Sequence, residues 1–400
     1  MVTRFLRILL WLASASTVVV FAVVAVRRIG SPLAYDPIES TLLDYARRIV
    51  EHRPLYAEPL LPVPIPILPA FPAVVSMLVR YLGPALWEPR AVSLGAMLVT
   101  TGLVFAVIRA ETLSWTLAAA GAGLMLAGQG LIVGRPEIAR PETLMLALVL
   151  AGFTTLRFSQ GFWGALFAAL LLSGACLTHA TALWFVAAMM FYVVGEDRGR
   201  VMVVMPAFAL LFGGSYILLS RVLGQWFNYY ACDLPLGSLR FAPTQLLQYL
   251  GTHLVGRLGV LTLAAVLSIA LPTPPWRGLR GLWMWMGAGM LGAGLLASQS
   301  SRTGAELLIP GVVVLAVLGS ISLHCVARHL AAWPGSSRGD GHGIVLAALV
   351  LQFLVFFSAT PTSLMNLRAL TSETESAELP PLGATIMPVA NAAPSAVPAR

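Results

Sequence analysis

Long apolar blocks alternate with short polar segments along the chain. Most blocks hold roughly 17–25 residues, the length of α-helix that crosses about 30 Å of hydrocarbon. Blocks of this length indicate membrane spans rather than the interior of a large soluble domain. The predicted spans are residues 6–26, 90–108, 114–134, 142–157, 162–177, 180–195, 201–220, 255–272, 280–298, 306–324 and 344–360. We therefore expect an all-α fold, a polytopic transmembrane helical bundle with about eleven spans.

Residues 60–83 form an ambiguous apolar block, because six prolines fall between positions 59 and 72. Proline in a helix interior removes a hydrogen bond and clashes with the preceding turn. If this block does not span and the N-terminus with Arg4 and Arg7 is cytoplasmic, most short arginine-bearing loops lie inside, as the positive-inside tendency favours. If the block spans, those loops all move outside. We therefore predict an interfacial or re-entrant segment on the outer face.

If residues 60–83 do not span, five polar segments lie on the same outer side: 35–58, 134–142, 178–181, 221–253 and 298–306. The first outer loop then covers residues 27–89, and the transmembrane domain covers residues 1–360. Residues 361–400 are rich in Ser, Glu, Ala and Pro, so we expect a disordered extracytoplasmic tail.

The composition agrees with a membrane protein and argues against other classes. Hydrophobic residues make up 58% of the chain and charged residues only 10%, against about 25% charged in soluble domains. The net charge of +8 comes from arginines scattered between apolar blocks, which set orientation and do not form a nucleic-acid-binding face. The three cysteines lie far apart without a CxxC pair, so they predict neither a disulfide framework nor a metal site.

The first outer loop contains two carboxylates one helical turn apart. Asp36, Pro37 and Glu39 open a stretch whose apolar positions recur with helical period, which predicts an amphipathic juxtamembrane helix. The same residues form a capping box, which is a sufficient structural reason for their presence. The functional alternative is that the carboxylates deprotonate an acceptor hydroxyl or hold a divalent metal ion. Both roles are compatible, since a cap also positions a side chain.

A tandem Arg-Pro-Glu between two predicted spans supplies Arg135, Glu137, Arg140 and Glu142. Charges at the membrane edge are costly unless they are paired or face water, so they indicate a functional site. An arginine fork suits a phosphate or pyrophosphate group. The structural alternative is that each arginine pairs with a neighbouring glutamate and ends a helix, with Pro141 opening the next one.

Three other outer segments hold weaker candidates. His179 lies in a short polar break, where a lone histidine is more often structural than a ligand. Tyr229 and Tyr230 belong to an aromatic loop, which suits either an interfacial belt or the stacking of a sugar or lipid headgroup. Arg302 is the single arginine of a polar connector.

Several of these motifs together resemble GT-C type membrane glycosyltransferases. The run from Asp36 to Pro59, an acidic residue followed by an amphipathic helix and a Pro-Leu-Tyr turn, resembles their first extracytoplasmic loop. Arg90-Ala-Val-Ser-Leu resembles their arginine-led second true span, and Arg140-Pro-Glu resembles their RPD motif. The bacterial branch related to mannosyl- and aminoarabinose-transferases is the most similar.

The resemblance implies a bacterial inner-membrane enzyme that moves a sugar from a polyprenyl-phosphate donor to a cell-envelope acceptor, with inversion, on the outer side. It implies an acidic base at Asp36, assisted by Glu39. The implied donor-phosphate residues are Arg135, Arg140, His179 and Arg302, and the implied substrate-binding residues are Glu137, Glu142, Tyr229 and Tyr230. No cofactor follows from these residues, and a divalent metal ion stays open.

Two alternatives stay open on the sequence. One is a multi-span transporter or lipid-carrier flippase, and the other is a catalytically inactive relative that kept the fold. A transporter would place charges along a path to the cytoplasmic side or break its spans at the midplane. The mid-span stretches of this chain are nearly free of charge, which favours the enzyme.

Overall fold

The computed structural model describes residues 2–358 apart from residues 33, 35–36, 59–66, 133–138, 197, 238–242, 272–277, 299–307 and 333–337. Every regular element in the described part of the chain is a helix and none is a β-strand, so the all-α prediction is confirmed. The expected tail, residues 361–400, lies outside the described residues.

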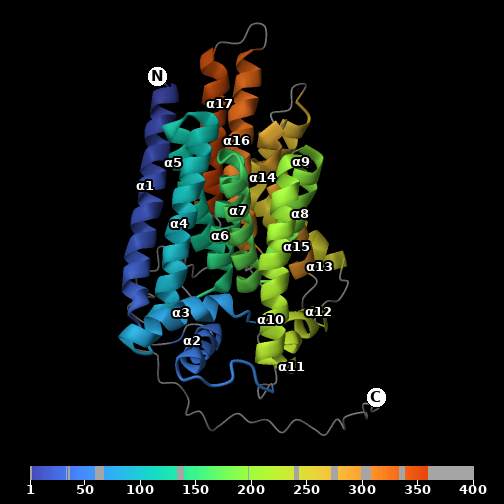
Figure 1. Cartoon of the computed structure of the whole chain (residues 1–400). Helices are drawn as coiled ribbons and strands as arrows, with labels where there is room; N and C mark the ends of the chain where they lie inside the picture. The colour runs from blue at the N-terminus through green and yellow to red at the C-terminus, as the bar shows by residue number, and fades with distance from the viewer. Residues whose placement is uncertain are drawn as a thin grey trace. The chain divides into compact units, whose positions relative to one another are not determined.

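The helices of the first half coincide closely with the apolar blocks of the sequence (Figure 1). Their bounds are α1 Val2–Ile29, α2 Pro37–Val50, α3 Ala70–Leu82, α4 Trp87–Thr112, α5 Trp115–Ile132, α6 Pro141–Phe158, α7 Phe162–Thr178 and α8 Ala182–Glu196. α2 begins at Pro37, whose fixed φ angle suits the first helical position. It is amphipathic, as the sequence predicts, with Leu42 and Ala46 buried.

The second half continues the bundle. Its helices are α9 Arg198–Phe208, α10 Gly214–Leu223, α11 Gln225–Asn228, α12 Leu234–Gly237, α13 Pro243–Gln248, α14 Gly256–Ile269, α15 Gly281–Ser298, α16 Leu308–Ala331 and α17 Arg338–Ser358. The π-helical turn Ala209–Gly213 joins α9 to α10, three residues after Pro206. Proline inside a helix cannot donate its hydrogen bond, and the wider turn accommodates that interruption.

Six helical stretches among the described residues are long and apolar enough to cross a membrane: Val2–Ile29, Trp87–Thr112, Pro141–Phe158, Arg198–Leu223, Ile309–Ala331 and Gly341–Ser358. Many large apolar side chains on them are exposed, Leu12 and Val19 of α1 among them. Exposed apolar surface of this kind suits contact with lipid chains rather than water. The chain is therefore a multi-pass membrane protein, and the total of eleven crossings stays a prediction.

Helix α3 lies across one end of the bundle instead of alongside α4 (Figure 1). Its 13 residues make a helix of about 20 Å, which is too short to span the hydrocarbon. Phe71, Val75 and Val79 are buried in a cluster with residues of α2, while Met77 and Tyr81 are exposed. This placement agrees with the non-spanning prediction for the described part of residues 60–83. We call the end that carries α2 and α3 the α2 end.

Small residues let the helices between the two ends approach closely. A Cβ atom added at Gly123 of α5 would lie 2.8 Å from the Ser14 Cβ atom of α1. A Cβ atom added at Gly319 of α16 would lie 2.8 Å from the Leu261 Cβ atom of α14. In a membrane, where apolar side chains gain little by leaving lipid, such close contacts supply much of the attraction between helices.

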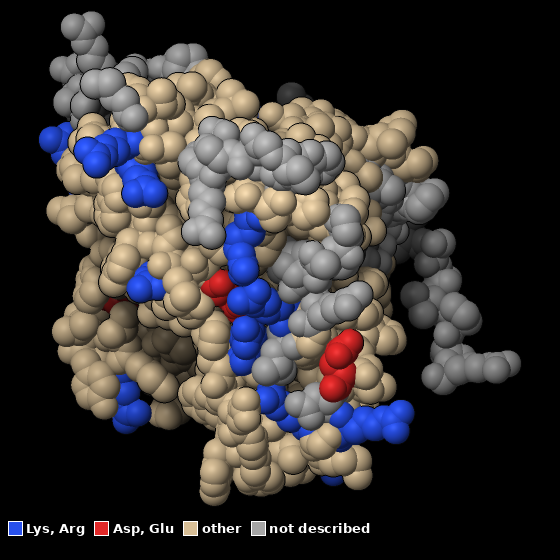
Figure 2. All heavy atoms as spheres, turned by 90° about the horizontal axis from the view of Figure 1, so that it is seen from above, with Lys and Arg blue, Asp and Glu red and all other residues tan. Residues whose placement is uncertain are grey.

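The opposite end of the bundle is held by a buried carboxylate, and we call it the Glu111 end. Glu111 of α4 accepts hydrogen bonds from Arg157 of α6 at 2.6 Å and from Arg280 at 3.0 Å. The indole N–H of Trp283 in α15 donates to the same carboxylate at 3.1 Å. Three segments far apart in the sequence are thereby joined at one side chain. Figure 2 views this end and shows many more arginine than acidic side chains on its surface.

Glu111→Gln should lower the free energy of unfolding by about 2–3 kcal/mol, because it removes a charged acceptor shared by two arginines. The loss should stay below that of a fully buried pair, since the Arg280 side chain is 40% exposed. Thermal unfolding of the purified protein in detergent measures the effect. Glu196→Gln, which neutralises an exposed glutamate at the same end, is the matched control. Equal melting temperatures for the two variants would contradict this role of Glu111.

Candidate functional site

The α2 end is organised around an ion pair between Glu39 of α2 and Arg90 of α4. The Arg90 Nε atom donates to Glu39 Oε1 at 2.9 Å, and Nη2 donates to Oε2 at 2.8 Å. The Glu39 and Arg90 side chains are 0% and 1% exposed. Two parallel hydrogen bonds between a guanidinium and a carboxylate form the strongest and most directional ion pair available to side chains. This pair fixes where α2 starts against the transmembrane bundle.

Arg90 also secures the end of the first helix. Its Nη1 atom donates to the carbonyl oxygen of Arg28 at 3.0 Å and to that of Ser31 at 2.7 Å. The last carbonyl groups of a helix have no N–H donor within the helix, so the Arg90 guanidinium supplies hydrogen-bond donors at the end of α1. One arginine therefore holds the chain on both sides of the segment that includes Asp36.

The same carboxylate reaches the segment before α6. The backbone N–H of Ala139 donates to Glu39 Oε1 at 3.2 Å. Next to it, the backbone N–H of Arg140 donates to the Ser93 hydroxyl oxygen at 2.8 Å, and the Ser93 hydroxyl donates to the Arg140 carbonyl at 3.3 Å. Arg90 and Ser93 are three residues apart and so lie on one face of α4. Together they fix the position of Arg140 relative to α2.

Arg140 precedes α6, and Pro141 and Glu142 form its first turn. The sequence expectation that Pro141 opens a helix is confirmed. Arg140 is only 6% exposed, which is unusual for a charged residue and requires compensating polar groups around it. A buried guanidinium at the edge of a membrane helix can bind an anionic group brought by a ligand.

Glu142 and His179 meet at the same end of the bundle. The His179 Nε2 atom lies 3.6 Å from Glu142 Oε1, and Nδ1 lies 2.7 Å from the Thr181 hydroxyl oxygen. His179 follows the last residue of α7 in an extended conformation, which directs its ring towards the start of α6. Glu142 Oε2 is buried and has no hydrogen-bond partner among the described residues. Glu142 lies in the first turn of α6, two residues after Arg140, so the pair is a candidate contact for a polar ligand at this end.

The expected aromatic loop is helical in the structure: Tyr229 and Tyr230 open a π-helical turn, Tyr229–Asp233, between α11 and α12. This segment packs against residues of α2. Tyr230 is 7% exposed, and its ring centroid lies 5.6 Å from that of Tyr56, while Tyr229 contacts Tyr230 edge-on at 5.3 Å. Tyr56 also contacts Tyr45 of α2 and Phe227. The Tyr56 hydroxyl donates to the Ile67 carbonyl oxygen at 2.8 Å. The cluster binds the first loop to the later helices of the chain.

Burial governs the ionisation of these tyrosines. It raises the pKa of Tyr45 and of Tyr56 well above the ordinary value, and it also raises the pKa of Tyr230. The hydroxyls therefore remain neutral at physiological pH and cannot serve as phenolate bases. Tyr230 in this arrangement is a packing residue, and Tyr229, which is half-buried, is the better placed of the two to contact a ligand.

Four candidates from the sequence, Asp36, Arg135, Glu137 and Arg302, lie outside the described residues. Asp36 is nevertheless the residue directly before α2, whose third residue is Glu39. Within the described part of the chain, no group of three or more His, Cys, Asp and Glu side chains could hold a metal ion. Glu142 and His179 are the described side chains here that could contribute to one.

Sequence reasoning missed the residues that connect the candidates. Arg90 and Ser93 stand out in the sequence only as members of the Arg90-Ala-Val-Ser-Leu motif, which assigns neither of them a role. The sequence did contain a signal for the Glu39–Arg90 pair: a lone arginine and a lone glutamate at the edges of apolar blocks are costly unless they form an ion pair or face water. The sequence could not say which glutamate Arg90 would pair with, since Glu39 lies 51 positions away.

Comparisons with known proteins place this architecture in a class. No protein-family model and no curated protein sequence matches the chain. Its structure does match solved structures, and these show that it has the fold of GT-C-type membrane glycosyltransferases, as the resemblance implied.

The similar structures are those of ArnT from Cupriavidus metallidurans and an oligosaccharyltransferase from Archaeoglobus fulgidus. ArnT bound to undecaprenyl phosphate gives a TM-score of 0.59 at 12% identity, covering 90% of this chain and 78% of that chain. Its apo state gives 0.60 at 11% identity, with 88% and 75% covered. The oligosaccharyltransferase, in complex with Zn and sulfate, gives 0.52 at 12% identity, with 88% and 52% covered.

Glu39→Gln should destabilise the protein by about 3–5 kcal/mol, because it leaves the buried Arg90 without a charged partner. Asp44→Asn is the matched control on α2, since the Asp44 side chain is exposed and surface ion pairs such as Asp44–Arg48 contribute below about 1 kcal/mol. The expected signs in Glu39→Gln are a lower melting temperature and faster tryptic cleavage after Arg53, which is exposed. Identical cleavage rates in both variants would show that the Glu39–Arg90 pair does not hold α2.

Proposed function

We propose that this protein transfers a sugar from a polyprenyl-phosphate donor to a cell-envelope acceptor, at the α2 end of its bundle. The proposal places the protein in a bacterial inner membrane, with a cytoplasmic N-terminus and the α2 end facing outward. The fold supports the general class, and the donor, acceptor and sidedness belong to the proposal. The observation that carries it is the convergence of Glu39, Ala139 and Arg140 through Arg90 and Ser93.

This convergence supports a proposal for the two groups that glycosyl transfer needs. An acceptor hydroxyl needs a base, and the departing polyprenyl phosphate needs cations close to its oxygens. Asp36, three residues before the fixed Glu39, is the proposed base. Arg140, whose backbone Ser93 holds, is the proposed principal phosphate ligand. Arg135, His179 and Arg302 are proposed as further phosphate ligands, with Glu137, Glu142 and Tyr229 on the sugar side.

The proposed reaction is one displacement. The Asp36 carboxylate takes the proton of the acceptor hydroxyl while the hydroxyl oxygen attacks the anomeric carbon. The bond between that carbon and the phosphate oxygen breaks, and the electron pair leaves on polyprenyl phosphate, so the anomeric configuration inverts. Arg140 stabilises the phosphate charge as it develops. Glu39 has both oxygens bonded to Arg90, so its proposed role is to position Asp36 and not to accept the proton.

Asp36→Asn should reduce transfer by about 10²–10⁴-fold, because an amide cannot accept the hydroxyl proton. Arg140→Ala should reduce it by about 10²-fold or more through loss of transition-state charge stabilisation. Membranes containing each variant are supplied with radiolabelled polyprenyl-phosphate sugars, and label in the envelope fraction is counted. Asp44→Asn, which neutralises an exposed carboxylate of α2, is the matched control and should keep full activity.

The outcomes separate the site from the function. Full transfer by both Asp36→Asn and Arg140→Ala would overturn the site, even if the wild-type protein is active. Solute uptake by the wild-type protein without any sugar transfer would overturn the enzyme and favour a transporter. The melting temperature of each variant is measured alongside, so that loss of folding is not mistaken for loss of chemistry.

Sidedness can be tested with single cysteines in a background without Cys176, Cys232 and Cys325. Glu51→Cys at the α2 end should react with a membrane-impermeant maleimide on intact cells, because Glu51 is exposed and proposed to face outward. Glu196→Cys at the opposite end should react only after the cells are permeabilised. The reverse pattern would invert the proposed orientation and the positive-inside assignment with it.

A further inference from the structure

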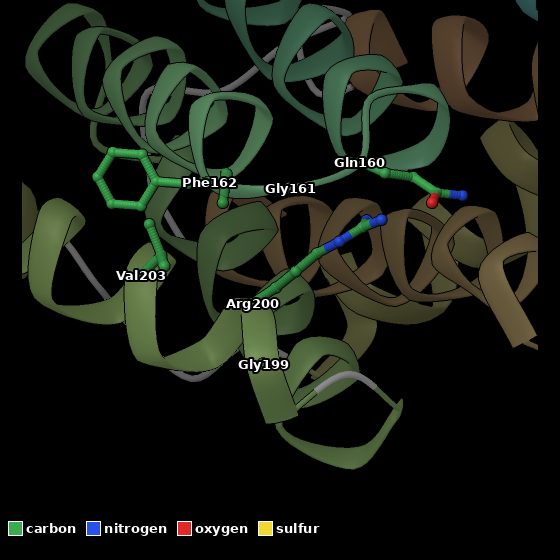
Figure 3. A pocket seen from close by; sticks show the side chains of 7 residues that line it. Gln160, Gly161, Phe162, Gly199, Arg200 and Val203 are labelled. Carbon is green, nitrogen blue, oxygen red and sulfur yellow. The ribbon is translucent and has the colours of Figure 1, made fainter.

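A cavity of about 350 Å³ lies at the Glu111 end of the bundle, away from the candidate active site. It is formed where α7 and α9 begin, and it is lined by Gln160, Gly161, Phe162, Ala165, Gly199, Arg200 and Val203. Figure 3 shows Arg200 extending from α9 towards the segment of Gln160 and Gly161, with Phe162 and Val203 on the other side. Nothing in the proposed glycosyl transfer uses this cavity.

The cavity has a polar and an apolar side. The polar side carries the Arg200 guanidinium, the Gln160 amide and the backbone at Gly161, a residue with no side chain to cover the first turn of α7. Arg200 donates a hydrogen bond to the Leu156 carbonyl oxygen, which holds its guanidinium at the cavity. A guanidinium has five N–H donors in a planar fork, so one side chain can hold this carbonyl and a phosphate together. The apolar side is Phe162, Ala165 and Val203.

The surrounding residues place the cavity at the depth of lipid headgroups. Trp163 is 77% exposed and Phe158 is 44% exposed beside the start of α7. Exposed aromatic side chains at a helix end mark the boundary between hydrocarbon and water. On α9, Met202 is 77% exposed, and this apolar exposure suits acyl chains. A ligand that satisfies both sides of the cavity therefore needs an anionic head and an apolar tail.

We propose that this cavity binds an anionic phospholipid of the surrounding membrane. The phosphate lies against Arg200 and the Gln160 amide, and the acyl chain follows Phe162 and Val203 towards the bilayer. Charge selects the anionic class, because arginine predominates on this end of the molecule (Figure 2).

Native mass spectrometry of the full-length protein, released from nanodiscs of phosphatidylglycerol and phosphatidylcholine, tests the proposal. The wild-type protein should retain phosphatidylglycerol in preference to phosphatidylcholine. Arg200→Ala should retain about tenfold less phosphatidylglycerol, since it removes the charge-assisted contact. Arg198→Ala is the matched control, because it removes the same charge from the same turn of α9 but lies outside the cavity lining. It should stay within about twofold of the wild-type protein.

A second variant keeps the charge and fills the cavity. Val203→Trp leaves Arg200 in place, and it should also lower phosphatidylglycerol retention while the melting temperature stays near that of the wild-type protein. Equal retention by Arg200→Ala and Arg198→Ala would overturn the proposal, as would equal retention of the two lipids by the wild-type protein. Displacement of the lipid by excess inorganic phosphate, with no effect of Val203→Trp, would reassign the cavity to a free phosphate and overturn the lipid site.

Discussion

The buried pair between Glu39 and Arg90 is the interaction on which the α2 end depends. Neither charge could remain in this apolar setting alone, so each requires the other and the hydrogen bonds around them. Arg90 reaches the end of α1, and Glu39 reaches the segment before α6, so one pair connects three parts of the chain. The geometry of Arg140, and of any chemistry beside it, follows from this connection. An amphipathic helix that only rested on the membrane surface could not provide such a fixed position.

A buried carboxylate bonded to arginine joins distant helices at both ends of the bundle, but the polar groups around it differ. At the Glu111 end, one carboxylate is shared by Arg157 and Arg280 and by the Trp283 indole, and it closes the bundle. At the α2 end the polar groups are more numerous: the Arg140 backbone is bonded to Ser93, and Glu142 lies close to His179. Between the two ends, small residues such as Gly123 and Gly319 let helices touch with little polar chemistry. Polar chemistry is thus concentrated where the helices stop.

The sequence predicted the architecture well and the site only in part. Helix positions followed from apolar blocks, because a spanning helix needs a fixed length of apolar chain. The prolines between 59 and 72 predicted an interfacial or re-entrant segment, and α3, within the described part of this block, lies across the bundle end. With residues 60–83 not counted as a span, the order of spans placed Glu39, Arg140, His179 and Tyr230 on the same side of the membrane. The structure has these residues at one end of the bundle. The sequence could not reveal that Glu39 pairs with Arg90, that Ser93 holds Arg140 or that Tyr230 packs on Tyr56, because such contacts depend on how distant helices rotate against each other.

Glycosyl transfer at the α2 end requires the donor phosphate to lie beside Arg140, and a cryo-electron microscopy structure with polyprenyl phosphate tests this requirement most directly. We expect phosphate density within about 4 Å of the Arg140 guanidinium, the distance of a charge-assisted contact. The polyprenyl chain should leave between helices at the same end. Phosphate density at the Glu111 end, or at mid-height in the bundle as in a transport path, would contradict the proposed function.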